Sequence, residues 1–137
     1  MVSDKKAAII YWSQTGNTEK VALAIKEGLE LGGVNVSMMV VEEAEGIDYF
    51  DYDLVGVGFP SHAWHLPKPT VDLLKGKLNE HRKAGMVKLG APKVPGKNAL
   101  IFCTYSGPQT GMDEATPAGK YAGQFFEHVG FKVLYEW

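Results

Sequence analysis

The side chains best suited to chemistry form a short polar run near the amino terminus. This run consists of Ser13, Gln14, Thr15, Gly16, Asn17 and Thr18. It follows the apolar stretch 7–11 and precedes a helix-like segment, so it lies between a predicted strand and the start of a helix. Unpaired N–H groups and the positive end of the helix dipole at such a junction favour a phosphate. The hydroxyls and side-chain amides add hydrogen bonds, and the run therefore indicates a phosphate site.

Two common phosphate-binding motifs are absent from this run. A P-loop has the pattern G-x-x-x-x-G-K-[ST], and a dinucleotide-binding loop has G-x-G-x-x-G after the strand. The alternative is a helix cap rich in Ser, Thr and Asn that binds no ligand. The six residues alone leave both interpretations open.

Strands and helices are predicted to alternate along the chain. Five short apolar runs have the continuous hydrophobicity of strands that are covered on both faces of a parallel sheet. These runs are 7–11, 34–41, 54–58, 99–103 and 131–135. Amphipathic segments lie between them: one ends near Gly32, and one follows Pro69. A third has Thr116 as its N-cap, with Tyr121, Phe125 and Val129 facing the core. The alternation predicts one open α/β domain over residues 1–137.

Three loops leave the carboxyl ends of the predicted strands, where open α/β sheets bind ligands. The first is the polar run described above. The second contains flat side chains and consists of Pro60, Ser61, His62, Ala63, Trp64, His65 and Leu66. The third places a tyrosine among small residues, and its candidate site residues are Thr104, Tyr105, Ser106, Gly107 and Gly111. A phosphate loop beside two aromatic loops predicts a site for a phosphorylated planar ring.

Composition excludes several classes of protein. The chain has 137 residues and a net charge of −2, which argues against a nucleic-acid binder. Its start has no apolar signal region and its apolar runs are too short to span a bilayer, so we expect a soluble cytoplasmic protein without membrane contact. Cys103 is the single cysteine and is predicted to be buried. His62 and His65 form an H-x-x-H pair without a third ligand nearby, so no metal site is expected.

Over nearly its whole length the chain resembles the flavodoxin family. Its first loop matches the family's phosphate signature, Ser/Thr-x-Thr-Gly-Asn-Thr, and the other two loops match by position and character. The resemblance implies FMN as the cofactor and a parallel sheet of strand order 2-1-3-4-5 with helices on both faces. It also implies that the first loop holds the phosphate and that the other two bracket the isoalloxazine ring. We expect Tyr105 on one face of the ring, and on the other Trp64, with His62 as the alternative.

Charge departs from the common pattern of the family. Many flavodoxins are acidic near the flavin, whereas the second loop here has His62 and His65 and no carboxylate, which should stabilise the reduced anionic ring. Elsewhere, 42–53 contains six carboxylates and no Lys or Arg, and 81–98 contains five Lys and Arg and no acid. These are either two solvated segments or a docking surface that orients a redox partner.

Three functions are compatible with these patterns. The preferred one is an FMN-binding electron carrier that exchanges electrons with redox partner proteins. The alternatives are an FMN-dependent NAD(P)H:quinone-type reductase and a structural or regulatory domain without flavin. The chain has no NAD(P) fingerprint, which favours the carrier, although the sequence does not decide whether the protein is an enzyme.

The resemblance also implies an element that the chain lacks. Family members usually place a last helix after the fifth strand, on the sheet face of the first helix, and this chain ends at Trp137. Apolar surface beside Val21, Ile25 and Leu29 should then lack its usual cover. Three explanations remain: a truncated or excised domain, a homodimer through this face, or cover from the crossover 81–98.

Overall fold

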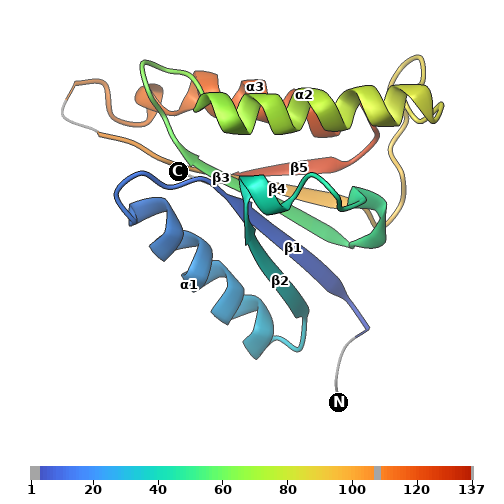
Figure 1. The fold of residues 1–137 in the computed structure, drawn as a ribbon, viewed down its shortest axis with the longest axis horizontal. Helices are drawn as coiled ribbons and strands as arrows, with labels where there is room; N and C mark the ends of the chain where they lie inside the picture. The colour runs from blue at the N-terminus through green and yellow to red at the C-terminus, as the bar shows by residue number, and fades with distance from the viewer. Residues whose placement is uncertain (1–3, 107–108, 137) are drawn as a thin grey trace.

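A five-stranded parallel sheet with helices on both faces forms the protein (Figure 1). The computed structural model describes residues 4–106 and 109–136. The strands are β1 (Lys6–Tyr11), β2 (Asn35–Val40), β3 (Leu54–Pro60), β4 (Asn98–Thr104) and β5 (Lys132–Glu136). Their order is β2-β1-β3-β4-β5, which confirms the predicted topology. Central strands are buried on both faces, as the apolar runs indicated: residues 7–10 of β1 are fully buried.

The helices divide unequally between the two faces of the sheet. Helix α1 (Asn17–Leu31) lies on one face, and α2 (Lys68–Lys83) and α3 (Thr116–Glu127) lie together on the other (Figure 1). Short 3₁₀ turns complete the fold, namely η1 (Val41–Glu43), η2 (Tyr49–Asp51) and η3 (Gly111–Glu114). Of the helices in residues 4–106 and 109–136, none is long and apolar enough to cross a membrane.

The most buried face of helix α3 consists mainly of small residues, and the predicted aromatic residues lie at its margin. Its buried positions are Ala118, Gly119, Ala122, Gly123 and Phe126. Of the predicted core residues, Val129 just after the helix is 2% exposed, and Tyr121 and Phe125 pack against the core while only partly buried. A Cβ at Gly123 would lie 2.1 Å from the hydroxyl oxygen of Tyr135, so the small face lets the helix backbone approach β5 closely. The N-cap residue is Ala115, because Thr116 is already helical and its hydroxyl donates to the Met112 carbonyl.

On the opposite face, part of the apolar surface beside α1 is covered by the sheet's own side chains. Phe102 lies directly over Gly58: a Cβ there would be 1.9 Å from the phenylalanine ring. Phe102 is consequently only 1% exposed, although α1 is the single helix on this face in the described part of the chain. Val21 and Leu134 remain 37% and 49% exposed.

The crossover between α2 and β4 does not cover the sheet face beside α1. Val94 donates to the Gly130 carbonyl, and Lys93 donates to the Phe131 carbonyl. These bonds fix the crossover to the connection between α3 and β5, at the edge of the sheet where the strands begin. The third explanation, in which the crossover 81–98 covers the face beside α1, is therefore wrong.

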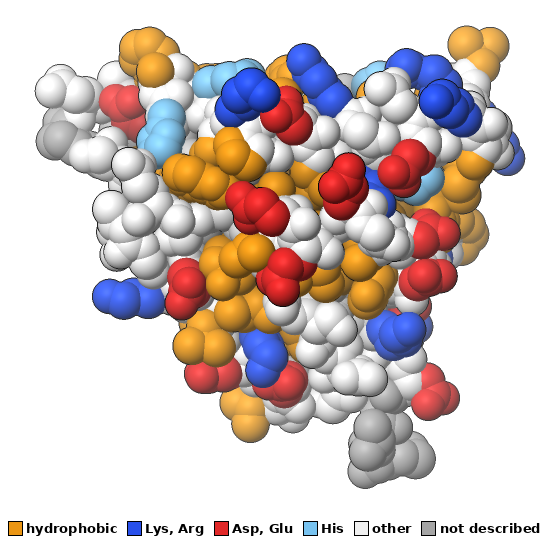
Figure 2. Space-filling view, viewed as in Figure 1, with side chains coloured by type: hydrophobic (Ala, Val, Ile, Leu, Met, Phe, Trp, Pro, Cys, Tyr) orange, Lys and Arg blue, Asp and Glu red, His pale blue; other side chains and the backbone are white. Residues whose placement is uncertain are grey.

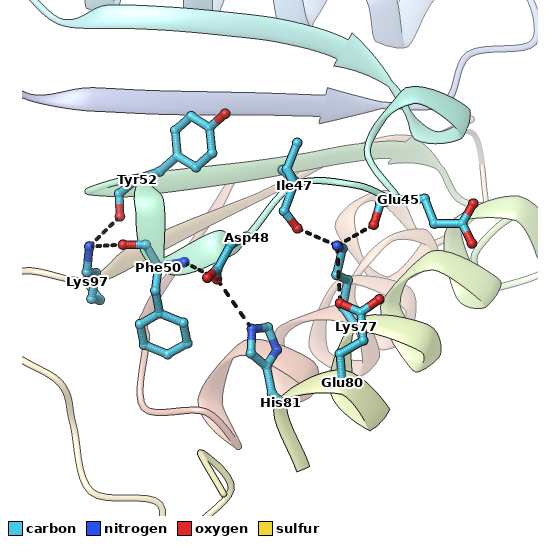
Figure 3. A network of polar contacts seen from close by, with 9 residues as sticks. All are labelled: Glu45, Ile47, Asp48, Phe50, Tyr52, Lys77, Glu80, His81 and Lys97. Carbon is cyan, nitrogen blue, oxygen red and sulfur yellow. Dashed lines mark hydrogen bonds and ion pairs between the residues drawn. The ribbon is translucent and has the colours of Figure 1, made fainter. Parts of the chain in front are cut away.

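Two lysines fix the acidic segment 42–53 against the rest of the fold (Figure 3). Lys77 of α2 is 3% exposed, and its ammonium donates to the carbonyls of Glu45 and Ile47. Lys97 donates to the carbonyls of Phe50 and Tyr52 at 2.7 and 2.9 Å. The segment has little regular structure of its own, so these charged donors satisfy carbonyl groups that no strand or helix pairs.

We expect Lys77→Met to destabilise the protein by about 2 to 3 kcal/mol, because it leaves two carbonyls without their charged donor. Lys75 is exposed on the same helix, and Lys75→Met should change the free energy of unfolding by less than about 0.5 kcal/mol. Urea unfolding of both variants measures the difference. Equal effects of the two substitutions would show that Lys77 does not hold the segment.

Candidate functional site

All three predicted loops line one cavity at the carboxyl edge of the sheet. The cavity has a volume of about 370 Å³. Its lining consists of Ser13, Gln14, Thr15, Asn17, Thr18, Pro60, Ser61, His62, Thr104, Tyr105 and Ser106. Residues separated by more than ninety positions in the sequence therefore meet at one site, as the strand order requires.

Backbone hydrogen bonds beyond the ends of the strands fix the loops relative to one another. The Trp12 N–H donates to the Gly58 carbonyl at 3.1 Å, which joins the first loop to β3. The Ser61 N–H donates to the Thr104 carbonyl at 2.9 Å, which joins the second loop to the third. The Ser61 hydroxyl also donates to the Glu114 carbonyl at 2.6 Å. The backbone pairing of the sheet thus continues into the segments that line the cavity nearest the strand ends.

The first loop leaves the start of α1 open. Its Gly16 is the N-cap residue, with φ of +91°, a conformation that glycine adopts without strain. Gly16 donates its N–H to the Ser13 hydroxyl at 3.0 Å, which closes the loop on itself. The first N–H groups of a helix have no intrahelical partner, and within the described residues no side chain caps those of α1. This arrangement supports an anion site and gives no support to the alternative of a simple side-chain cap.

Thr18 and Thr104 connect the first loop to the end of β4. Their hydroxyl oxygens lie 2.9 Å apart, and either one can donate. Thr18 is 2% exposed, although it lines the cavity. Neighbouring Cys103 is buried as predicted, and burial raises the pKa of its thiol to about 12, so it is a structural residue and no ready nucleophile.

The second loop contains a tight turn that the sequence did not reveal. His62 and His65 exchange two backbone hydrogen bonds of 2.9 and 3.0 Å around Ala63 and Trp64. These two central residues have φ of +49° and +65°, the left-handed values that hairpin turns normally assign to Asn-Gly. Left-handed backbone at residues with a Cβ costs about 1 to 3 kcal/mol each and gathers at ligand sites.

The turn separates the two candidates for the ring-stacking position. His62 lines the cavity, and its ring makes an edge-on contact with Trp12 at 6.0 Å between centroids. Trp64 lies at the tip of the turn, is 57% exposed and is not among the lining residues. This placement favours the alternative, His62, over the preferred Trp64, and the stacking residue stays a prediction. Tyr105 lines the cavity and is partly buried.

Other predicted residues lie near the cavity without lining it. Ala63 belongs to the turn, and the His65 ring contacts Tyr121 at 5.1 Å between centroids. Gly111 begins η3, and Gly107 lies outside the described residues. Sequence reasoning missed Trp12. The signal was an aromatic residue directly before the polar run, but its contact with His62 depends on how β1 and β3 pair.

Comparisons with known proteins agree with this geometry. The family model for flavodoxin matches residues 9–136. None of the curated protein sequences compared with the chain matches it. Among solved structures, the two-electron reduced flavodoxin of Megasphaera elsdenii superposes with a TM-score of 0.67 at 22% identity, covering 95% of this chain and 82% of that one.

Two further structures extend the comparison. A mutant flavodoxin of Fusobacterium nucleatum bound to flavin mononucleotide gives a TM-score of 0.66 at 17% identity, over 95% of this chain and 68% of that one. Rubredoxin oxygen:oxidoreductase of Desulfovibrio gigas gives 0.67 at 18%, over 93% of this chain but only 28% of that one. These likenesses show a shared fold, and the family match covers almost the whole chain. This protein belongs to the flavodoxin family, whose cofactor is FMN.

Proposed function

We propose that this protein carries electrons between redox partner proteins through FMN bound in the three-loop cavity. The phosphate would lie against the first loop and the start of α1, and the ring between the second and third loops. The observation that supports this most is the opening of an uncapped helix start into the same cavity as His62 and Tyr105. Bound FMN supplies the group that accepts and donates electrons, and the protein supplies binding, orientation and electrostatic tuning.

The charged segments are candidates for contact with a partner. Glu42, Glu45, Asp72 and Glu80 line a groove between η1 and α2, and acidic side chains form a band across this face (Figure 2). The basic crossover lies close by, since Lys97 contacts the acidic segment and His81 lies 3.9 Å from Asp48 (Figure 3). The acidic segment 42–53 and the basic crossover 81–98 are therefore neighbours. Their combined electric field should orient a partner protein within one Debye length, about 10 Å.

FMN binding should depend on the first loop. We expect Thr15→Ala with Asn17→Ala to weaken FMN binding by about 2 kcal/mol or more, because it removes two hydrogen-bonding side chains from a charged phosphate. Fluorescence titration of the protein stripped of flavin measures the loss. Riboflavin lacks the phosphate and is the matched control ligand, so its affinity should be unchanged.

Two results of this titration, and one result of a separate turnover assay, would contradict the proposal. An FMN affinity within twofold of wild type would refute the phosphate assignment. Failure of the wild-type protein to bind FMN would instead favour the structural or regulatory domain. Turnover with NAD(P)H and a quinone in the absence of a partner protein would favour the reductase.

The histidines of the second loop should raise the reduction potential of the bound flavin. We expect His62→Asp with His65→Asp to lower the midpoint potential by tens of millivolts, roughly, because two negative charges near the ring oppose added electrons. His128→Asp makes one such substitution after α3, away from the cavity, and should leave the potential nearly unaltered. Potentiometry of the three proteins tests the account, which an unchanged or higher potential in the double variant would refute.

We also propose that a second copy of the chain covers the apolar surface beside α1. The contact between the two copies would include Val21 and Leu134, whose large apolar side chains are exposed. Sedimentation should then show a dimer that Leu134→Glu dissociates, whereas Leu89→Glu, in the exposed crossover, should leave it intact. A monomeric wild-type protein that binds no hydrophobic dye would show that this face needs no further cover.

A further inference from the structure

Within the described part of the chain, Thr104 is the one residue whose hydrogen bonds join all three loops of the cavity. Its hydroxyl lies 2.9 Å from the hydroxyl of Thr18 in the first loop. Its carbonyl accepts the Ser61 N–H of the second loop at 2.9 Å. Thr104 itself begins the third loop and ends β4. A change at this side chain therefore acts directly on the first loop and leaves the backbone bond to the second loop in place.

The pair of hydroxyls has two possible hydrogen-bond directions, and a phosphate would select one of them. Each hydroxyl has a single proton to donate and can also accept. A phosphate oxygen of FMN only accepts hydrogen bonds, so the Thr18 hydroxyl must donate its hydrogen to that oxygen in order to bind it. The contact with Thr104 is then kept only if Thr104 donates to Thr18. Two hydrogen bonds in series polarise each other and strengthen the terminal one.

We propose that Thr104 is a positioning residue that acts through Thr18: its hydroxyl donates to the Thr18 hydroxyl and thereby directs the Thr18 proton toward the phosphate. The role rests on the proposed binding of FMN in this cavity. It predicts that Thr104 contributes to recognition of the phosphate although it need not touch it. The burial of Thr18 supports this, because a residue that is only 2% exposed leaves little room for water to orient its hydroxyl.

Isosteric variants separate this role from packing. Thr104→Val and Thr18→Val each replace a hydroxyl by a methyl group, and Thr104→Ser restores the hydroxyl without the methyl group. Thr70→Val is the matched control, because Thr70 is fully buried and its hydroxyl has no hydrogen-bond partner among residues 4–106 and 109–136, so its removal should be harmless. FMN and riboflavin affinities of each stripped protein, and of the Thr18→Val, Thr104→Val double variant, form the measurement.

Thr104→Val should weaken FMN binding about three- to tenfold, and riboflavin binding less than twofold. The same substitution in the Thr18→Val background should cost FMN affinity less than twofold, since the residue through which it acts is gone. Thr104→Ser and Thr70→Val should bind FMN like wild type.

Several outcomes would overturn the role of Thr104. These are no loss of FMN affinity in Thr104→Val, equal losses for FMN and riboflavin, the same loss with and without the Thr18 hydroxyl, and failure of serine to restore binding. If Thr104→Val does not fold, Thr104→Ala carries the same comparisons. A wild-type protein that fails to prefer FMN to riboflavin would instead refute the proposed function.

Discussion

Parallel pairing of β1, β3 and β4 in one register is the constraint on which the cavity depends. Tyr11 pairs with Gly58, and Pro60 pairs with Thr104, so the last residues of these strands end side by side. The backbone hydrogen bonds donated by Trp12 and Ser61 then extend the strand pairing into the loops. A slip of one residue would move every side chain to the other face and separate Thr18 from Thr104. The geometry of the site is therefore inherited from the sheet.

Backbone strain at the site is confined to the second loop. The first loop is relaxed, because Gly16 takes the left-handed position and Ser13 closes the loop. The second loop takes the same left-handed region at Ala63 and Trp64, where a Cβ is present. The loop proposed to bind the phosphate is thus free of this backbone strain. The loop proposed to contact the ring is strained, and a ligand that changes the conformation of the turn would release that strain energy.

Local periodicity was enough to predict the strands and their alternation with helices. Each of these depends on neighbours within a few positions, and the strand order followed from the family resemblance. The features that were missed depend on tertiary contacts. No local pattern shows that Lys77 and His81 of an exposed-looking helix are buried, or that His62 meets Trp12. The turn 62–65 has no Gly or Asn to mark it, and the face of α3 is decided by how closely its glycines approach β5.

The contact between Gly58 and Phe102 constrains how this sequence can change over time. The two residues are paired across β3 and β4, and the ring fills the volume that any side chain at position 58 would need. A larger residue at 58 is compatible with the fold only if the residue at 102 becomes smaller. The smaller residue would in turn uncover the sheet face beside α1, so this pair links strand packing to the need for a covering element. In related sequences, the two positions should therefore vary together with whatever covers that face.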